Sequence, residues 1–388
     1  MSKYGKNSTK IVVYNIIIWC IVIIIVAVVL GAVFFFFYPK HQASSRQSQT
    51  DLPDSVDDGG DAIENENAPF SLGKEENIEL RVPTGNSWEK NVLKEEHGIQ
   101  GKVKANMQGT TPKEKAFGVD HWNRDQIKAV YVLDTLKDMP SDAVDLSADQ
   151  DGSVMGWVDS SQALFIAGEG GVRAPDNSNA LFAWYENAEV IDLGGNLHTD
   201  HTSKMGFLFG HCPKLKTLNL DGLTTDKVKK YTKMFAGCRS LESLDLSGFN
   251  TEDATGFFGM FWNCVKLEEL DLSSFKSFYV EDFQIMFRGC TALRRIIWNP
   301  KFFSTASATE MGQMFCDCSS LSALDVSCFD TSNVINMYMM FYNCYSLESL
   351  EVSGWNLSHV KTHADMFAKA DKLCEMYGLN GDALFSAG

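Results

Sequence analysis

The sequence predicts a solenoid of short parallel strands, capped at its N-terminal end by a β-rich module and preceded by one membrane-spanning helix. A frame of apolar residues recurs eight times from Phe182 to Phe367, in steps of 27, 26, 26, 26, 28, 26 and 26 residues. Each complete copy ends in an alternating apolar and polar stretch, and an uncharged run of 28 residues lies at 11–38. A fixed period of this length with atypical end copies indicates stacked units, none of which can bury its apolar face alone.

The frame is clearest at Met234–Phe249. With Phe235 as the origin, Cys238 lies at +3, Leu241 at +6 and the stretch Leu244–Leu246 at +9 to +11. A period of two in this stretch places its two leucines on one face of a short half-buried strand and its aspartate on the other. Stacking such strands about 4.8 Å apart makes a parallel sheet over one continuous core. The phenylalanine at the origin and the leucine at +6 fill the far side of this core, beneath a short helical or irregular segment, as in leucine-rich repeats.

Six copies of the frame carry a cysteine at the same position, +3. They are Cys212, Cys238, Cys264, Cys290, Cys318 and Cys344. Because they share one frame position, we expect them to stack as an inward-facing ladder of buried free thiols, which behave as small apolar residues. The alternative is a disulfide between neighbouring copies, which needs a particular Cβ geometry. The cysteines outside the ladder, Cys316, Cys328 and Cys374, are the better candidates for oxidation.

A polar row accompanies the thiols at +10, consisting of Asp192, Asn219, Asp245, Asp271, Asp325 and Glu351. Serines at +12 run parallel to it, at Ser247, Ser273, Ser327 and Ser353. These side chains leave successive strands about 5 Å apart, so we expect an acidic stripe on the concave face. Such a stripe suits a basic or hydroxyl-rich ligand, with or without a divalent cation. The alternative interpretation is that Asp and Ser hydrogen-bond locally to the backbone between rungs, as a structural feature of the repeat.

The acidic row is interrupted once. Ile297, with Trp298 beside it, replaces the polar residue, and the 28-residue step that follows Phe287 adds a bulge at the same place. An irregularity of this kind in a regular array suggests a contact surface, with sequence drift as the alternative.

The frame M-F-x-x-C-x-x-L-x-x-L-D-L-S-x-F, and above all the stretch Met314–Val334, resembles the BspA family of leucine-rich-repeat surface proteins. The segment Asp149–Leu193 resembles the entry module that precedes the repeats in that family. The resemblance implies a leucine-rich-repeat fold, a location at the cell surface and a role in adhesion, including to matrix proteins in some members. It implies no particular ligand.

The N-terminal part of the chain is predicted to reach from the cytoplasm to the outside. Residues 1–10 form a basic cytoplasmic tail, and residues 11–38 form a transmembrane signal anchor, because more than about 18 consecutive apolar residues span a bilayer. The alternatives are a buried core helix and a cleaved signal peptide. A signal peptide has a shorter apolar region and a small-x-small cleavage site, which the Phe-rich end of this run does not resemble.

Residues 39–116 are predicted to be a disordered acidic stalk, because the stretch Asp51–Glu66 holds seven acids and no base. A small folded unit near Ile78–Val92 is the alternative. A β-rich cap at 117–180 and about eight repeats at 181–388 follow.

The cap is predicted from four short strand-like stretches separated by turn residues. They are Ile127–Leu133, Val154–Trp157, Leu164–Ala167 and Gly171–Ala174. Such strands would cover the open edge that a solenoid otherwise exposes at its first repeat.

No motif indicates catalysis, a cofactor or a metal. The stretch Gly168–Arg173 begins like a dinucleotide loop, but arginine takes the third glycine position and no long helix is predicted to follow, so we interpret it as a turn in the cap. The histidine pairs His198/His201 and His359/His363 are interpreted as a solvated loop and a surface turn and not as metal ligands. We therefore predict that the chain is not an enzyme. The net charge of −16 argues against nucleic acid as a partner.

Two classes of function fit these observations. The first is a single-pass cell-membrane protein with a cytoplasmic N-terminus, whose extracellular solenoid binds or adheres to an extracellular protein or glycan. The second is a structural cell-envelope protein that packs against neighbouring surface components or wall polymer. The stalk favours the first, because repeats that lie against the membrane would have no use for its reach.

Overall fold

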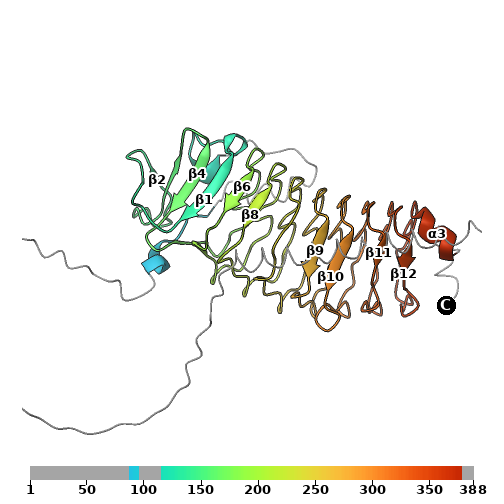
Figure 1. Ribbon diagram of the computed structural model, residues 1–388. Coiled ribbons are helices and arrows are strands. Elements are labelled where there is room, and N and C mark those ends of the chain that lie inside the picture. Colours follow the sequence, from blue (N-terminus) through green and yellow to red (C-terminus); the bar gives the residue numbers. More distant parts are fainter. Residues whose placement is uncertain (1–86, 96–114, 378–388) are drawn as a thin grey trace, which may run out of the picture. The chain divides into compact units, whose positions relative to one another are not determined.

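The computed structural model describes residues 87–95 and 115–377 (Figure 1). The predicted membrane span at 11–38 and most of the predicted stalk lie outside these residues. No helix within the described ranges is long and apolar enough to cross a bilayer. The described secondary structure is mainly short strands, with the 3-10 turns η1 (Ser87–Lys90), η2 (Ala116–Gly118) and η3 (Arg124–Gln126) and the α-helix α3 (Asp371–Tyr377).

The N-terminal module is built from five strands. They are β1 (Ala129–Leu133), β2 (Val144–Asp145), β3 (Met155–Val158), β4 (Ala163–Ala167) and β5 (Val172–Arg173). The main sheet has the order β2-β3-β4-β1-β6-β8, with β1 parallel to both β4 and β6 and with β3 antiparallel to β4. Because β6 (Val190–Asp192) belongs to the first repeat, β1 covers the strand edge that this repeat would otherwise expose. The four predicted strand stretches are confirmed.

A stretch that we assigned to the stalk is part of this module. Val92 bridges in parallel to Arg173 of β5, and the buried Leu93 donates its N–H to the Arg173 carbonyl oxygen at 2.9 Å. The Asn91 amide donates to the carbonyl oxygens of Glu169 and Gly171 at 2.8 and 2.9 Å. The prediction of disorder up to residue 116 is therefore wrong for Ser87–Glu95. The prediction failed because it extended the acidic composition of the upstream residues over the short apolar stretch Val92–Leu93, which pairs at the edge of the module.

Eight repeats follow, and we call each one a rung, named by the phenylalanine at its frame origin. The strands of the rungs are β6, β8 (Thr217–Asn219), β9 (Glu269–Leu272), β10 (Arg295–Trp298), β11 (Ala323–Leu324) and β12 (Ser349–Leu350) (Figure 1). A further strand, β7 (Leu197–His198), pairs with β5. The eight origin phenylalanines form one continuous stack, with ring centroids 5.4–5.8 Å apart and ring planes within 10° of parallel. This stack is the axis of the core.

The turn side of each rung, at frame positions −4 to +2, is not helical. In rung 235 the N–H groups of Tyr231, Lys233, Phe235 and Gly237 donate to carbonyl oxygens of the next rung at 2.7–3.0 Å. The N–H groups between them turn back to carbonyls of their own rung. This alternation needs a left-handed residue at −2 and +2, here Lys233 at φ 52° and Gly237 at φ 77°. Of the two alternatives that we predicted for the far side, a helical or an irregular segment, the structure shows the irregular one, a ladder of turns, because alternate N–H groups bond to the next rung.

The strand side, at frame positions +8 to +12, is less regular than we predicted. Strands pair as β6 with β8, β9 with β10 and β11 with β12, while residues 243–246 of rung 235 form no strand. The continuous ladder thus runs on the turn side, and the predicted continuous sheet on a concave face is interrupted. We refer below to the strand face and make no use of its curvature.

Arg124 of η3 supplies the hydrogen-bond donors that the first rung lacks on the turn side. In every later rung the turn-side carbonyl oxygens accept N–H groups of the preceding rung, but no rung precedes rung 182. The buried Arg124 guanidinium instead donates to the carbonyl oxygens of Ala180, Leu181 and Ala183 and lies over the Tyr185 ring. One side chain from the N-terminal module therefore replaces the donors of a missing rung.

Candidate binding surface

The acidic row lies on the strand face, with its members exposed or half-buried. Each uses one oxygen inside its own turn. Asp245, Asp271 and Asp325 accept the N–H of the serine two residues later at 2.8–2.9 Å, and Glu351 does the same at 2.8 Å. The local hydrogen bonding that we considered as the alternative is present, within the turn and not between rungs. The second carboxylate oxygen is not used by these bonds.

These hydrogen bonds also fix the charge of the row. Main-chain and hydroxyl hydrogen bonds from Ser247 lower the pKa of Asp245, and the hydroxyl and main chain of Ser273 lower the pKa of Asp271. Ser327 lowers the pKa of Asp325 in the same way. The predicted serine row is thus the source of this effect, and these carboxylates stay ionised at neutral pH.

Neighbouring acids on the same face differ, because a base of the next rung neutralises them. Glu242 pairs with Lys266 at 3.2 Å, Glu189 with Lys216 at 2.9 Å, and Glu268 and Glu269 with Arg294 and Arg295 at 3.7 and 3.5 Å. Within the described residues no member of the acidic row has an ion-pair partner within 4.0 Å; Asp192 accepts only the Asn219 amide across rungs, at 2.8 Å. The acidic row therefore carries negative charge that no ion pair on this face offsets.

A cleft accompanies the row where the sheet is interrupted. It has a volume of about 300 Å³ and lies between Leu218–Leu223 of one rung and Asp245–Phe249 of the next. A smaller one of about 100 Å³ separates Leu244–Ser247 from Asp271–Ser274. The N–H groups of Leu244 and Leu246 donate to no carbonyl of a described neighbouring rung. Rung 235 therefore combines a cleft, main-chain N–H groups that donate to no neighbouring rung, and carboxylates.

The interruption of the row at Ile297 is a packing feature. Trp298 stacks on Phe303 with centroids 5.1 Å apart and tilts against Phe329 at 5.4 Å. The extra residues of this rung form a turn in which the Asn299 carbonyl oxygen accepts the N–H groups of Phe302 and Phe303. Trp298 thus packs, partly buried, against the core.

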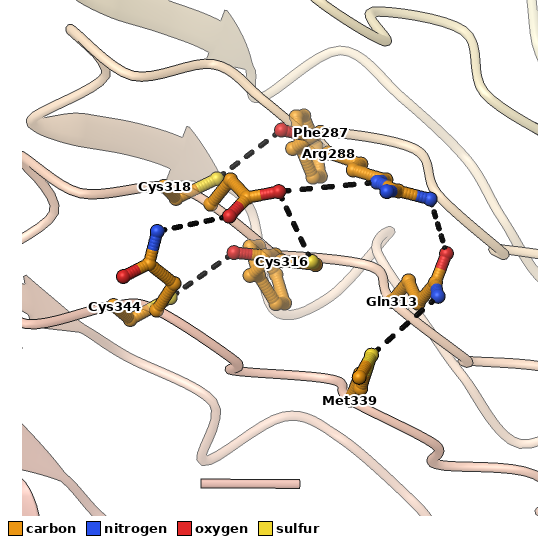
Figure 2. A network of polar contacts seen from close by, with 10 residues as sticks. Phe287, Arg288, Gln313, Cys316, Cys318, Met339 and Cys344 are labelled. Carbon is orange, nitrogen blue, oxygen red and sulfur yellow. Dashed lines mark hydrogen bonds and ion pairs between the residues drawn. The ribbon is translucent and has the colours of Figure 1, made fainter. Parts of the chain in front are cut away.

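The six frame cysteines lie in the interior, all free and fully buried. Each thiol donates to the main-chain carbonyl oxygen of the origin phenylalanine one rung earlier, at 3.0–3.2 Å. Figure 2 shows two of these contacts, from Cys318 to Phe287 and from Cys344. Burial raises the pKa of Cys212 and Cys290 to about 12. Of the three other cysteines that the structure describes, Cys328 and Cys374 are half-buried, whereas Cys316 is buried.

Two features of the rungs were missed by sequence reasoning. The first is a buried hydroxyl ladder, formed by Thr199, Thr225, Thr251, Ser277, Thr305 and Thr331, which the repeat period itself would have revealed at +16 to +18. The second is a polar network on the turn side (Figure 2). In it Arg288 donates to Gln313 at 2.7 Å, and Asp317 accepts from Cys316 at 3.3 Å and from Asn343 at 3.0 Å.

The histidines and the glycine-rich stretch take structural positions. His198 stacks on Trp88 with centroids 4.1 Å apart, and His201 pairs with Asp200 at 2.9 Å. Gly170 and Gly171 have positive φ in the tight turn that leads into β5. Among the residues that the structure describes, no group of three or more His, Cys, Asp or Glu side chains is arranged to hold a metal ion.

These features define a leucine-rich repeat solenoid with a β-rich entry module. The chain belongs to the family DUF285, described as Mycoplasma protein of unknown function, whose matches cover residues 177–299 and 270–378 and so just over half of the chain. A leucine-rich repeat protein from Bacteroides ovatus, known from a crystal structure, is 15% identical over 61% of this chain and 68% of its own, with a TM-score of 0.22. No curated protein matches the sequence.

Proposed function

We propose that this chain is a BspA-like surface protein, anchored by residues 11–38 with its N-terminus in the cytoplasm, and that its strand face binds a basic segment of an extracellular protein. The observation that carries the proposal is the contrast on that face. Acids such as Glu242 and Glu268 are neutralised by the next rung, whereas Asp245, Asp271 and Asp325 are ionised and without an ion-pair partner in the described chain.

The physical argument is one of charge without an ion pair. Asp245 and Asp271 lie one rung apart and repel each other, and Arg295 offsets this repulsion at Asp271 without an ion-pair contact. An arriving cationic side chain would add to that relief. The cleft beside Asp245 adds shape, and the free N–H groups of Leu244 and Leu246 add hydrogen-bond donors for an extended segment. The same charge disfavours an anionic wall polymer as partner, so packing against such a polymer is the weaker alternative.

The test uses the compact unit Glu79–Gly388, probed with arrays of matrix proteins and glycans. The variant D245N/D271N/D325N removes the charge but keeps an acceptor oxygen for each serine N–H, so its melting temperature should match the unaltered unit. Binding to the array protein recognised by the unaltered unit should weaken by about tenfold or more, and its salt dependence should flatten.

The matched control is E242Q/E268Q, which removes paired acids from the same face and should leave binding unchanged. If the triple variant unfolds, the carboxylates are structural and the proposal is wrong. If it folds and binds as before, the contact surface lies elsewhere.

A further inference from the structure

A second charged surface runs along the start of the turn side, at frame positions −6 and −5. We call it the ridge, and its line at −5 is Lys204, Lys230, Gly256, Asp282 and Glu310, one residue from each of five successive rungs. From Lys230 to Glu310 these residues are joined by consecutive parallel bridges. Their spacing is therefore that of hydrogen-bonded strands, about 4.8 Å per rung, and the line is about 20 Å long.

The sign of charge inverts along the ridge. Lys204 and Lys230 form its basic half and Asp282 and Glu310 its acidic half, with Gly256 between them. The adjacent line at −6 follows the same pattern, with Lys229 on one side of Thr255 and Glu281 on the other.

These charges form no ion pair within the described chain, although Lys230 attracts Asp282 across Gly256. None of Lys204, Lys229, Lys230, Glu281, Asp282 and Glu310 makes an ion pair within 4.0 Å among the described residues. Asp282 accepts the N–H of Gln284 at 2.9 Å and Glu310 accepts the Asn336 amide at 2.9 Å, but both of these partners are neutral. Elsewhere on the described solenoid, seven ion pairs join side chains of opposite sign on successive rungs.

The basic half also borders a depression of about 400 Å³. Lys204, Lys229 and Lys230 line it together with Phe207 and Thr232, and no carboxylate contributes to the lining. The depression lies where no parallel bridge joins Lys204 to Lys230. A carboxylate supplied from outside the chain would fit its charge.

The pattern is self-complementary under a two-fold axis that passes rung 261 at right angles to the ridge. Such an axis reverses the order of the rungs and keeps each frame position facing its own kind. Lys204 then faces Glu310, Lys230 faces Asp282 and Lys229 faces Glu281 of the other copy. At the centre Gly256 is buried, so the half-buried Thr255 of each copy lies beside the axis.

We propose that the ridge is the interface of an antiparallel homodimer of this chain, held by the basic half of each copy against the acidic half of the other. The inference does not rest on the proposed ligand, because the ridge and the acidic row occupy different frame positions. A contact about 20 Å long buries an area at the small end of the range for specific interfaces. The dimer is therefore weak and depends on low ionic strength.

The experiment is sedimentation velocity on the unit Glu79–Gly388 at low salt, with circular dichroism to monitor folding. The unaltered unit should dimerise, and raising the salt to about 0.5 M, where the Debye length is about 4 Å, should dissociate it. The basic-half variant K204E/K229E and the acidic-half variant E281K/E310K leave the pair Lys230 and Asp282 unchanged, and each should be monomeric. Mixing them should restore a dimer, and combining all four substitutions in one chain should restore the homodimer.

Several results would overturn the proposal. These are an unaltered unit that stays monomeric at every concentration, half-variants that still dimerise, and a combined variant that stays monomeric. Binding of the lysine depression to an inorganic anion by a monomeric unit would likewise replace the dimer with a ligand site.

A second measurement does not depend on charge reversal. Thr255→Cys places a thiol beside the axis, so mild oxidation should link two copies, whereas Lys361→Cys, at the same frame position four rungs away, should not link them. Equal linking by both variants would contradict the antiparallel register.

Discussion

The hydroxyl of Thr251 hydrogen-bonds to both main-chain polar groups of Lys276 in the next rung. It donates to the Lys276 carbonyl oxygen at 2.9 Å and accepts the Lys276 N–H at 2.7 Å. Thr225 makes the same pair of bonds to Asn250, and Thr331 makes it to Asn356. A buried hydroxyl thus replaces the strand ladder at the corner where each rung turns from the strand side to the turn side.

We expect Thr251→Val to lower the free energy of unfolding by about 2–3 kcal/mol, although valine has nearly the same shape. The reason is that it leaves two buried main-chain groups of Lys276 without a partner. Thr251→Ser keeps both bonds and loses one methyl, so it should cost about 1 kcal/mol. Urea denaturation of the three proteins measures the difference. Equal losses for the two variants would show that the hydroxyl contributes nothing beyond its volume.

The cysteine ladder should make the fold sensitive to alkali. Burial holds the folded pKa of Cys212 and Cys290 at about 12, whereas an unfolded thiol ionises near its ordinary value of about 8.5–9. Between these values the unfolded chain has lost protons that the folded chain retains, so stability falls as pH rises and is unaffected by these groups below about pH 8. Chemical denaturation at several pH values measures it. A stability that does not change from pH 8 to 11 would contradict this.

Replacing Arg124 should uncouple the N-terminal module from the first rung. Arg124→Met keeps much of the side-chain volume but removes the donors to Ala180, Leu181 and Ala183, so we expect a loss of about 2–4 kcal/mol. Hydrogen exchange should show that amides of Phe182–Tyr185 lose protection before those of rung 315. Arg239→Met, at an exposed arginine, is the control and should have no effect. Uniform loss of protection along all rungs would instead indicate global destabilisation.

The predicted membrane topology is tested on intact cells. A tag placed before residue 1 should stay protected from added protease, while the repeats are released by it. The physical reason is the basic stretch Lys3–Lys10, which is predicted to hold the N-terminus in the cytoplasm. Spontaneous release of the complete ectodomain into the medium would favour a cleaved signal peptide over the anchor.

Much of the fold could be predicted from the sequence because period and composition are local properties. The spacing of Phe235, Cys238, Leu241 and Leu246 determined the stacked rungs, the inward thiols and the outward carboxylates, since each follows from which residues alternate within one rung. The strands of the N-terminal module could equally be predicted from the turn residues that separate them.

Only the tertiary structure decided the features that depend on two rungs at once. It selected turns and not a helix for the far side because Lys233 and Gly237 bond across to Phe258 and Trp262, and it placed Arg124 on carbonyls 56 to 59 residues away. It also paired Glu242 with Lys266 while leaving Asp245 unneutralised, and brought Lys230 and Asp282 onto one line. These outcomes depend on which side chains meet at a rung spacing of about 5 Å, and that register arises only when the chain has closed each turn of the solenoid.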